Sequence, residues 1–448
     1  MLKLPDEFVQ RIKSQLKEEA DAFLHSLNEA PVVSVRFNQK KNSAHLAGEK
    51  IPWCNNGIYL SERPSFTHDP LFHAGCYYVQ EASSMFLEKA FEPFLQEKKN
   101  IHVLDLCAAP GGKSTHLLSL MNEKSLLVSN EYVSSRVGVL KENIVKWGNA
   151  NVVVTNNEAK DFQQLEEWFD VIAADAPCSG EGLFRKNNDT TIEWTDKNIA
   201  TCVFRQQQIL SDVLPALKEN GILIYSTCTL NPDENENRIQ WLCENGMECV
   251  TISIDKSWGI EEIKTGKCIA YRFLSHRLKG EGFFISIMRK VSSVNFSSKE
   301  NQQNKFPFQE LKNSDELKSW LRNGEEFSFI SSKEKMFALP KNLFSAMYEL
   351  KQKLNLRYAG IEIAESKNGK MIPSHALSLS NQLNRNFFPE IELVRDDAIR
   401  FLKKEAIQIS TNKTGFHLVT FLGYVLGFVN VLRDRINNYY PTELRIRK

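Results

Sequence analysis

Two cysteines in this sequence follow segments that are predicted to be buried β-strands. Cys178 ends the segment VIAADAPC, Cys228 ends ILIYSTC, and Asp175 precedes Cys178 by three positions. Open α/β sheets bind ligands at the carboxyl ends of their parallel strands, so we expect these side chains at one rim of a sheet. A cysteine there can act as a nucleophile when its thiolate is favoured. The pair could instead be a disulfide, a metal pair or two packing residues.

Six further cysteines have a simpler interpretation, because a lone cysteine is most often a small buried hydrophobe. This interpretation is given to Cys54, Cys76, Cys202, Cys243, Cys249 and Cys268. The nine cysteines are odd in number and no pair has C-x-x-C spacing, which argues against a disulfide framework and a zinc knuckle and favours a reducing cytosol. No histidine stands at ligand spacing from Cys178 and Cys228, so no metal ion is predicted.

A glycine-rich turn joins a predicted strand to a predicted helix in LDLCAAPGGKST, residues 104–115. Such a turn lets a ligand approach the backbone, and the helix N-terminus adds partial positive charge. The last residues of this segment, GGKST, resemble the end of a phosphate-binding P-loop. That motif, however, needs a glycine where this chain has Leu106 or Cys107. Glu131 ends the next strand, where an acid commonly binds ribose hydroxyls. Loop and acid together fit NAD or S-adenosylmethionine (SAM), and the alternative is a structural turn with a helix-capping glutamate.

The elements that must position these motifs alternate between strand and helix. Predicted strands are 101–106, 125–132, 151–155, 171–177 and 222–229, and predicted helices are 114–121, 134–148 and 205–217. This alternation predicts parallel strands joined by right-handed crossovers, which is an α/β fold. The later segments ECVTISI and GFFISIMRK are predicted to form a terminal antiparallel pair.

Composition excludes several other classes of protein. The chain has 448 residues, of which 42% are apolar and 25% charged, and it has no long apolar run and no secretory signal. These values exclude membrane-spanning, collagen-like, coiled-coil and small secreted proteins. Because 56 basic residues nearly balance 55 acidic residues, no overall field attracts nucleic acid, and local clusters must bind it.

Two regions flank the alternating core. The N-terminal region begins with apolar residues at helical spacing from Phe8 to Leu27, and the strand-like segment VVSVRF follows. The polar segment SSVNFSSKENQQNK, residues 292–305, is predicted to be a linker. Beyond it, the tail alternates apolar residues with glycine, as in a small β-barrel or sheet. We expect separate cores on the two sides of the linker.

Three ordered segments carry a resemblance to a known family. LDLCAAPGGK, DAPCSGEGLFRK and YSTCTLNPDENE resemble the motifs of the NOP/Sun family of SAM-dependent RNA cytosine-C5 methyltransferases. The helical start, YYVQEASSM (77–85), RFLSHRLKGEGFFISIMRK and the tail LGFVNVLRDRINNYYPTELRI are similar to the bacterial 16S rRNA methyltransferase F subgroup. The match is loose over 306–400.

The resemblance implies a Rossmann-like SAM methyltransferase core with an N-terminal α+β extension and a C-terminal PUA-like RNA-binding region. The implied division is an N-terminal RNA-binding extension at 1–95, the core at 96–291, the linker at 292–305, an intermediate region at 306–385 and the PUA-like domain at 386–448. The implied activity is methyl transfer from SAM to C5 of cytosine in 16S ribosomal RNA, free or in the small subunit. The implied protein is a cytoplasmic monomer that binds neither membrane nor metal.

The chemistry gives the two thiols distinct roles. C5 of cytosine is a poor nucleophile until a thiolate adds to C6, after which a base must remove the C5 proton and the thiolate must leave. The resemblance assigns the attack to Cys228, product release to Cys178 and the cytosine edge to Asp175. Cytosine-C5 methyltransferases that act on DNA use the Pro-Cys residue as nucleophile, whereas this chain has both cysteines.

The resemblance also assigns the cofactor contacts. SAM would be bound by Cys107, Ala108, Ala109, Pro110, Gly111, Gly112, Lys113, Glu131, Arg136, Glu158 and Asp175. Glu131 would bind the ribose, and Glu158 stands where the family usually has an aspartate near the adenine. Arg136 is equally well interpreted as a solvated helix residue.

Three basic clusters are candidate RNA contacts, although each alone could be a solvated face. They are Arg185 and Lys186; Arg36, Lys40 and Lys41; and Arg433, Arg435, Arg445, Arg447 and Lys448, with Tyr439 and Tyr440 available to stack on bases. Two alternatives stay open, the same chemistry on tRNA and a non-catalytic RNA-binding ribosome assembly factor. An NAD dehydrogenase is disfavoured because CAAPGGK is not G-x-G-x-x-G.

Overall fold

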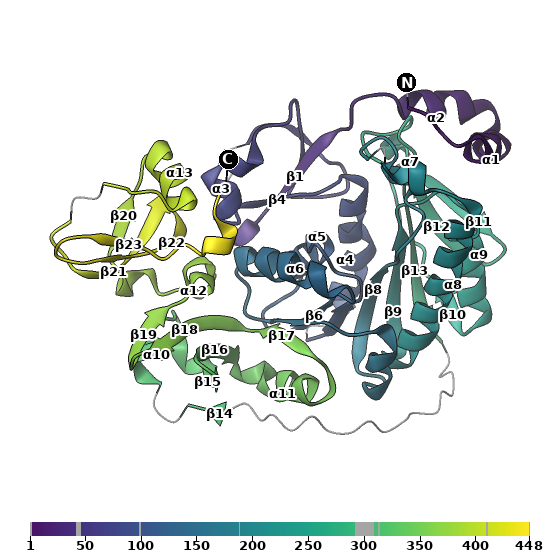
Figure 1. Cartoon of the computed structure of the whole chain (residues 1–448). Coiled ribbons are helices and arrows are strands. Elements are labelled where there is room, and N and C mark those ends of the chain that lie inside the picture. Colours follow the sequence, from purple (N-terminus) through teal and green to yellow (C-terminus); the bar gives the residue numbers. More distant parts are fainter. Residues whose placement is uncertain are drawn as a thin grey trace.

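A mixed sheet forms the centre of the protein, whose structure is a computed structural model (Figure 1). The structure describes residues 2–41, 46–97, 100–187, 189–291, 309–311, 314–408 and 411–447. The central sheet has ten strands in the order β11-β12-β13-β9-β8-β5-β6-β7-β17, and β10 also pairs with β13. Five strands are mutually parallel: β5 (His102–Asp105), β6 (Leu126–Asn130), β7 (Val152–Thr155), β8 (Phe169–Asp175) and β9 (Leu217–Thr227).

Helices cover both faces of this sheet because its strands are apolar on both sides. Val103 of β5 lies in the core beneath α4 (Leu87–Glu97), α5 (Gly112–Leu120) and α6 (Ser134–Trp147). Its neighbour Leu104 points into the opposite core, beneath α8 (Asp196–Val213), α9 (Glu236–Glu244) and α11 (Phe344–Lys353). The predicted α/β alternation is therefore confirmed as a doubly wound fold.

Antiparallel strands complete one side of the sheet. β13 (Phe283–Lys290) pairs with β9. β10 (Met247–Cys249) pairs with β13, as the sequence predicted for these two segments. A hairpin of β11 (Glu261–Thr265) and β12 (Cys268–Phe273), which the sequence analysis missed, also pairs with β13. The short helix α7 (Asp189–Glu193) lies between β8 and α8 in the chain.

The N-terminal region combines two helices with a small sheet. The helices α1 (Asp6–Leu16) and α2 (Ala20–Ser26) pack on Phe184, Trp194 and Leu230 of the core. The sheet has the order β2-β3-β1-β4. Its strands are β1 (Val33–Phe37), β2 (Glu49–Lys50), β3 (Gly57–Leu60) and β4 (Tyr77–Val79), and α3 (Pro70–His73) precedes β4.

Two further sheets follow residue 308. The first has the order β14-β15-β16-β18-β19 and the second β20-β21-β22-β23. Their strands are β14 (Gln309–Glu310), β15 (Phe327–Ser332), β16 (Lys335–Pro340), β18 (Ile361–Lys367), β19 (Lys370–Pro373), β20 (Glu390–Glu392), β21 (Gly415–Phe421), β22 (Tyr424–Val431) and β23 (Ile436–Asn438). The helices here, besides α11, are α10 (Asp315–Ser319), α12 (His375–Leu379) and α13 (Arg395–Lys403). In the part of the chain described, no helix is long and apolar enough to cross a membrane.

The expectation of separate cores is wrong. β17 (Leu356–Ala359) joins the central sheet beside β7, and Met347 and Leu350 of α11 lie in the same apolar cluster as Leu104. These contacts make the intermediate region part of the core that surrounds the central sheet. The predicted linker at 292–305 lies outside the described residues, and the domain boundaries stay predictions.

The tail also shares a core with the N-terminal region. Val35 and Leu71 lie in one apolar cluster with Phe401 and Val429, and Figure 1 shows α3 beside the yellow C-terminal strands. The hydroxyl of Tyr440 lies 3.3 Å from Nδ1 of His73. The tail therefore covers apolar surface of residues 33–79.

Deleting residues 386–448 should destabilise the rest of the protein, because the apolar side chains of the N-terminal sheet would lose their cover. We expect the midpoint of thermal unfolding to fall by at least about 5 °C in scanning calorimetry. The control is the double change Arg433→Ala and Arg435→Ala on the exposed surface of the same region. The control should unfold as the wild type does, and a truncated protein that also does so would contradict the shared core.

Candidate active site

The structure brings Cys178 and Cys228 together at one rim of the sheet. β8 and β9 are parallel neighbours with Asp175 in register with Ser226, so the residues that follow both strands leave the sheet side by side. The two sulfurs are 3.2 Å apart, and the backbone N–H of Cys228 points at Sγ of Cys178 at 3.3 Å. Both cysteines are free. The rim therefore presents two thiols to the same space.

A buried carboxylate fixes the loop that carries Cys178. Glu234 accepts hydrogen bonds from the backbone N–H of Ser179 at 3.0 Å, from the Ser179 hydroxyl at 2.5 Å and from the Gln206 amide at 2.9 Å. Burial raises the pKa of Glu234. The Gly182 N–H donates to the Cys228 carbonyl at 2.8 Å, which joins the two loops directly.

The N-terminal helix α1 also reaches this rim. The fully buried Glu181 accepts from Arg11 at 2.6 Å, from the Trp194 indole at 2.8 Å and from the Leu230 N–H at 3.1 Å. Replacing Arg11 would leave an unpaired buried carboxylate two residues after the Cys178–Ser179 turn. Sequence reasoning missed Arg11, Glu181 and Glu234, because each acts through partners that are distant in the chain.

Asp175 and Lys113 form an ion pair that links the rim to the glycine turn. Lys113 Nζ lies 2.8 Å from Asp175 Oδ2, and the Ser226 hydroxyl donates to Asp175 Oδ1 at 2.8 Å. Burial opposes the charge on Lys113, but the Asp175 carboxylate outweighs it and raises the pKa of the lysine. Asp175 is therefore held in place from two sides, with about a third of its side chain still exposed.

The glycine turn encloses a small cavity. Gly111 has φ +115°, a left-handed conformation that side chains rarely adopt, and α5 begins at Gly112. The cavity of about 210 Å³ is lined by Tyr78, Val79, Gln80, Glu81, Ser84, Cys107, Ala108, Ala109, Pro110, Gly112, Lys113 and Asp175. Five of these residues come from the N-terminal region. The segment YYVQEASSM supplied them, but sequence reasoning gave it no role in the site.

Acidic side chains surround the same turn. At the end of β5, Asp105 is fully buried and accepts from the Ser114 hydroxyl at 2.6 Å, and its Oδ1 atom has no hydrogen-bond partner among the described residues. Burial raises the pKa of Asp105 to about 7. Glu131 accepts from the backbone N–H groups of Ala109 at 3.2 Å and Val133 at 2.8 Å.

The two remaining predicted cofactor contacts lie differently. Arg136 donates to the Ala109 carbonyl at 2.7 Å, so it supports the turn from α6. Glu158 is exposed, pairs with Lys160 at 2.5 Å and is not among the residues that line the cavity. The structure therefore brings Arg136 to the turn and leaves Glu158 apart from it.

Two predicted RNA contacts on the N-terminal strand are wrong. Arg36 is 1% exposed and donates to Gln80 at 2.8 Å and to Thr115 Oγ1 at 2.7 Å, while its guanidinium lies over the Trp147 ring. Lys41 donates to two backbone carbonyls, at 2.6 and 2.7 Å. Both side chains hold the N-terminal region to the core. Lys40 is exposed and pairs with Glu123.

Two further predicted contacts are also wrong. Arg185 is buried against Glu281, with Nε 3.0 Å from the carboxylate, and Tyr440 is 1% exposed among apolar residues, so neither can reach RNA. Lys186 is exposed, Tyr439 is half-buried and Lys448 lies outside the described residues. In the predicted basic cluster of the tail, Arg433, Arg435, Arg445 and Arg447 are exposed.

Comparison with known proteins covers almost the whole chain. Family profiles match residues 93–289 as 16S rRNA methyltransferase RsmB/F, residues 4–82 as the N-terminal domain of 16S rRNA methyltransferase RsmF and residues 388–446 as the RsmF PUA domain. Ribosomal RNA small subunit methyltransferase F of Aeromonas hydrophila is 32% identical over 98% of this chain and 97% of its own. The chain belongs to this methyltransferase family. The protein of the same name from Vibrio vulnificus is 31% identical with the same coverage.

Solved structures agree with this membership. A methyltransferase homologue from Pyrococcus horikoshii superposes with a TM-score of 0.56 at 29% identity, over 65% of this chain and 96% of that one. NSun6 from the same organism, solved with SFG, gives 0.55 at 22% identity, over 64% and 99%. The resemblance and the fold class predicted from the sequence are thus confirmed, and the chain is an RNA methyltransferase with a C-terminal PUA domain.

Replacing Gly111 with valine should weaken SAM binding. A β-branched residue cannot adopt φ +115° without strain, and its Cβ would lie 3.3 Å from Asn143 Cβ. We expect the affinity to fall at least about tenfold in isothermal titration calorimetry. The control is Gly138→Ala in α6, where an added Cβ meets nothing within 4 Å. Unchanged SAM affinity in Gly111→Val would contradict this site.

The buried carboxyl group of Asp105 should make the free energy of unfolding depend on pH. Its pKa is about 3.9 in an unfolded chain and about 7 in the fold, so between these values the folded protein holds a proton that the unfolded chain has lost. The contribution of Asp105 to the free energy of unfolding therefore falls as pH rises from 4 to 7.

In urea titrations, Asp105→Asn should gain stability relative to the wild type over that window, on the order of 4 kcal/mol. The control is Asp434→Asn at an exposed position. If the difference in free energy of unfolding between Asp105→Asn and the wild type did not change with pH, the Asp105 carboxyl would not titrate between pH 4 and 7.

Proposed function

We propose that this protein transfers a methyl group from SAM to C5 of a cytosine in 16S ribosomal RNA, through a covalent bond between Cys228 and C6. The observation that carries the proposal is the contact between two free thiols, 3.2 Å apart, beside Asp175 at the carboxyl ends of β8 and β9. The substrate follows from the relatives, which are named small-subunit ribosomal RNA methyltransferases. Action on this RNA also makes the cytoplasm the proposed location.

The residues around the glycine turn fit SAM, whose sulfonium and ammonium groups are cationic and whose carboxylate is anionic. One buried oxygen of Asp105 has no hydrogen-bond partner in the part of the chain that the structure describes, and Glu131 and Asp175 lie on the same turn and rim. The start of α5 and Lys113 would receive the carboxylate. The neighbouring fold of NSun6, solved with the SAM analogue SFG, supports the same cofactor. When bound, SAM supplies an electrophilic methyl group.

The side chains of this rim can carry out the remaining steps. The Cys228 thiolate would form a bond to C6, which moves the C5–C6 π electrons to C5 and, with protonation at N3, leaves the ring neutral. Asp175 would hold the N3 and N4 edge of the base. After C5 gains the methyl group, loss of the C5 proton to a base expels the Cys228 thiolate, and loss of the N3 proton then leaves neutral, aromatic 5-methylcytosine.

Electrostatics support different roles for the two thiols, with Cys228 as the nucleophile and Cys178 in product release. The contact with Cys228 Sγ, together with burial, raises the pKa of the Cys178 thiol well above its ordinary value. Cys178 therefore keeps its proton at neutral pH, and a protonated thiol is a poor nucleophile. A proton held next to the bond that must break suits the release step.

A cytosine can enter this rim after leaving its base stack. Several exposed basic residues could contact phosphates: Lys186 near the rim, which also lies 3.7 Å from Glu281, and Arg433, Arg435 and Arg445 in the PUA domain with Arg447 directly after it. They lie on two parts of the chain, at the rim and in the tail. We infer that the RNA contacts both parts while its target base occupies the rim.

Two single substitutions separate the roles of the cysteines. Cys228→Ala removes the nucleophile, so methyl transfer should fall at least about 10³-fold and no covalent protein–RNA adduct should form. Cys178→Ala should still attack and methylate but release product slowly, so a protein–RNA adduct should accumulate as a slow band on a denaturing gel. Cys202→Ala, at a half-buried thiol in α8, is the control and should behave as the wild type.

The reverse pattern would overturn this assignment. An adduct in Cys228→Ala and none in Cys178→Ala would make Cys178 the nucleophile, as in the enzymes that act on DNA. Normal methylation by both variants would make the two cysteines packing residues.

A further inference from the structure

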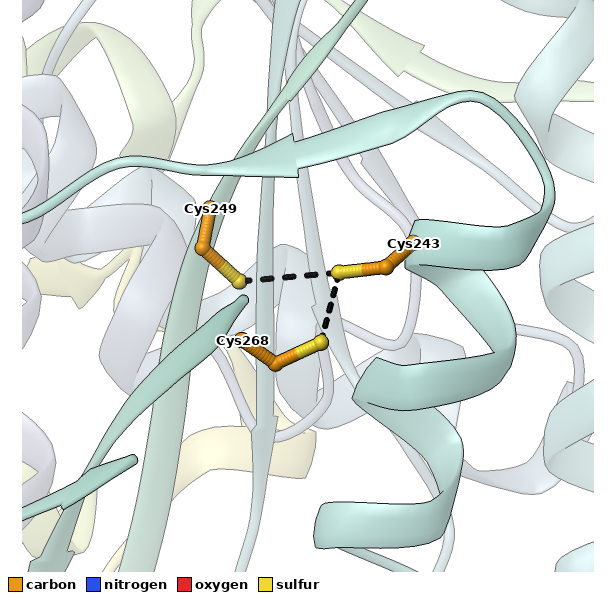
Figure 2. Close-up of side chains that lie close together, drawn as sticks. All are labelled: Cys243, Cys249 and Cys268. Carbon is orange, nitrogen blue, oxygen red and sulfur yellow. Dashed lines mark hydrogen bonds between the residues drawn. The ribbon is translucent and has the colours of Figure 1, made fainter. Parts of the chain in front are cut away.

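Three cysteines gather at the end of α9, on the side of β13 away from β9 (Figure 2). The Sγ atom of Cys243 lies 3.9 Å from that of Cys249 and 2.7 Å from that of Cys268. All three sulfurs lie within 4.8 Å of one another, and all three cysteines are free. The sequence analysis interpreted each as a lone buried hydrophobe, and the structure shows that they form one cluster.

The strand pairing explains why these cysteines meet. β12 and β10 pair with successive stretches of the same edge of β13, because Tyr271 faces Ile285 and Cys249 faces Met288. Cys268 begins β12 and Cys249 ends β10, so both lie where the two strands approach each other. The Ser286 hydroxyl of β13 lies 3.9 Å from Cys249 Sγ and donates a hydrogen bond to the carbonyl of Ile269, the residue after Cys268.

The helix α9 closes the cluster and is also joined to the catalytic rim. Cys243 is the next-to-last residue of α9, and it faces the two strand ends. Before the other end of the helix, Asn235 accepts a hydrogen bond from the Thr227 hydroxyl, one residue from Cys228. The cluster is therefore separate from the active site but holds the far end of the same helix.

We propose that Cys243, Cys249 and Cys268 together bind one Zn²⁺ ion, with a water molecule as its fourth ligand. Zinc binds thiolates at about 2.3 Å in a tetrahedron, which places the sulfurs about 3.8 Å apart. The distance from Cys243 to Cys249 already has this value. Cys268 would move away from Cys243 by about 1 Å. The spacing C-x₅-C-x₁₈-C differs from a zinc knuckle, which is why the sequence gave no metal signal.

The surroundings also favour this ion. Three converging sulfurs are soft ligands, which select zinc or copper(I) over magnesium or calcium. Within the described ranges, no fourth Cys, His, Asp or Glu side chain joins the cluster at this spacing. Cys243 and Cys249 are half-buried, so solvent can reach the fourth position of the tetrahedron. A zinc ion there would fasten the end of α9 to the sheet.

The test uses the full chain, reduced and freed of metal by a chelator. Titration with Zn²⁺ against a chromophoric chelator should give one ion per chain, and the midpoint of thermal unfolding should rise with bound zinc. Co²⁺ should give the thiolate-to-cobalt absorption of a tetrahedral site. Each of Cys243→Ser, Cys249→Ser and Cys268→Ser should weaken Zn²⁺ binding by at least about 100-fold.

Two control variants locate the ion. The double change Cys178→Ser and Cys228→Ser removes the other close pair of thiols, and Cys54→Ser disrupts the buried cluster of Cys54, Glu88 and His116. Both control variants should still bind one Zn²⁺. Alkylation followed by mass spectrometry of the wild type gives a second readout that needs no variant. Zinc should protect Cys243, Cys249 and Cys268 from the reagent and leave Cys202 reactive.

Four results would overturn the proposal. The first is a folded, reduced wild type that binds no stoichiometric Zn²⁺. The second is Zn²⁺ binding that depends on Cys178 and Cys228 rather than on the cluster. The third is binding of Cu⁺ in a three-coordinate site that Zn²⁺ does not occupy. A disulfide between Cys243 and Cys268 in protein whose thiols were blocked at lysis would also overturn it, and would make the cluster a redox site.

Discussion

The parallel pairing of β8 with β9 is the constraint on which the active site depends. Asp175 lies in register with Ser226, so the Pro-Cys and Thr-Cys segments leave the sheet at the same level and their thiols meet. A shift by one residue would turn each side chain to the other face of the sheet. The buried carboxylate of Glu234 and the close approach of Gly182 to the Cys228 carbonyl then fix the two loops against each other.

The regions of the chain around these two strands share packed cores and do not pack as separate modules. The N-terminal region supplies Arg11 to Glu181 beneath the rim and Tyr78 and Gln80 to the wall of the cavity at the glycine turn. The tail in turn packs on the N-terminal sheet, and β17 extends the central sheet. Because the PUA domain packs on the N-terminal sheet, which in turn packs on the core, RNA bound to this domain would be held in a fixed position relative to the thiols.

Much of this arrangement could be predicted because its signals are local. Apolar runs such as VIAADAP and ILIYSTC indicate buried parallel strands, and such strands place Cys178 and Cys228 at one edge. The features that were missed depend on partners far apart in the sequence. Arg36 resembles a surface charge beside Lys40 and Lys41, yet it is buried because Gln80 and Thr115 satisfy it.

The cysteine cluster was missed for a related reason. Cys243, Cys249 and Cys268 have no motif spacing, and they meet because β10 and β12 share an edge of β13. The β11–β12 hairpin that carries Cys268 was itself not predicted. Glu158, suggested as a cofactor contact by the family pattern, is exposed and pairs with Lys160, and its contact with the cofactor stays a prediction.

The most direct test of the central claim is bisulfite sequencing of total RNA from the source organism with and without this gene. We predict a cytosine in 16S ribosomal RNA that resists conversion in the wild type and is converted in the deletion strain. Wild-type protein should restore its resistance, and Cys228→Ala should not. Loss of resistance at a tRNA position instead would contradict the proposed substrate. An unchanged pattern in all RNA would contradict cytosine-C5 methylation by this protein.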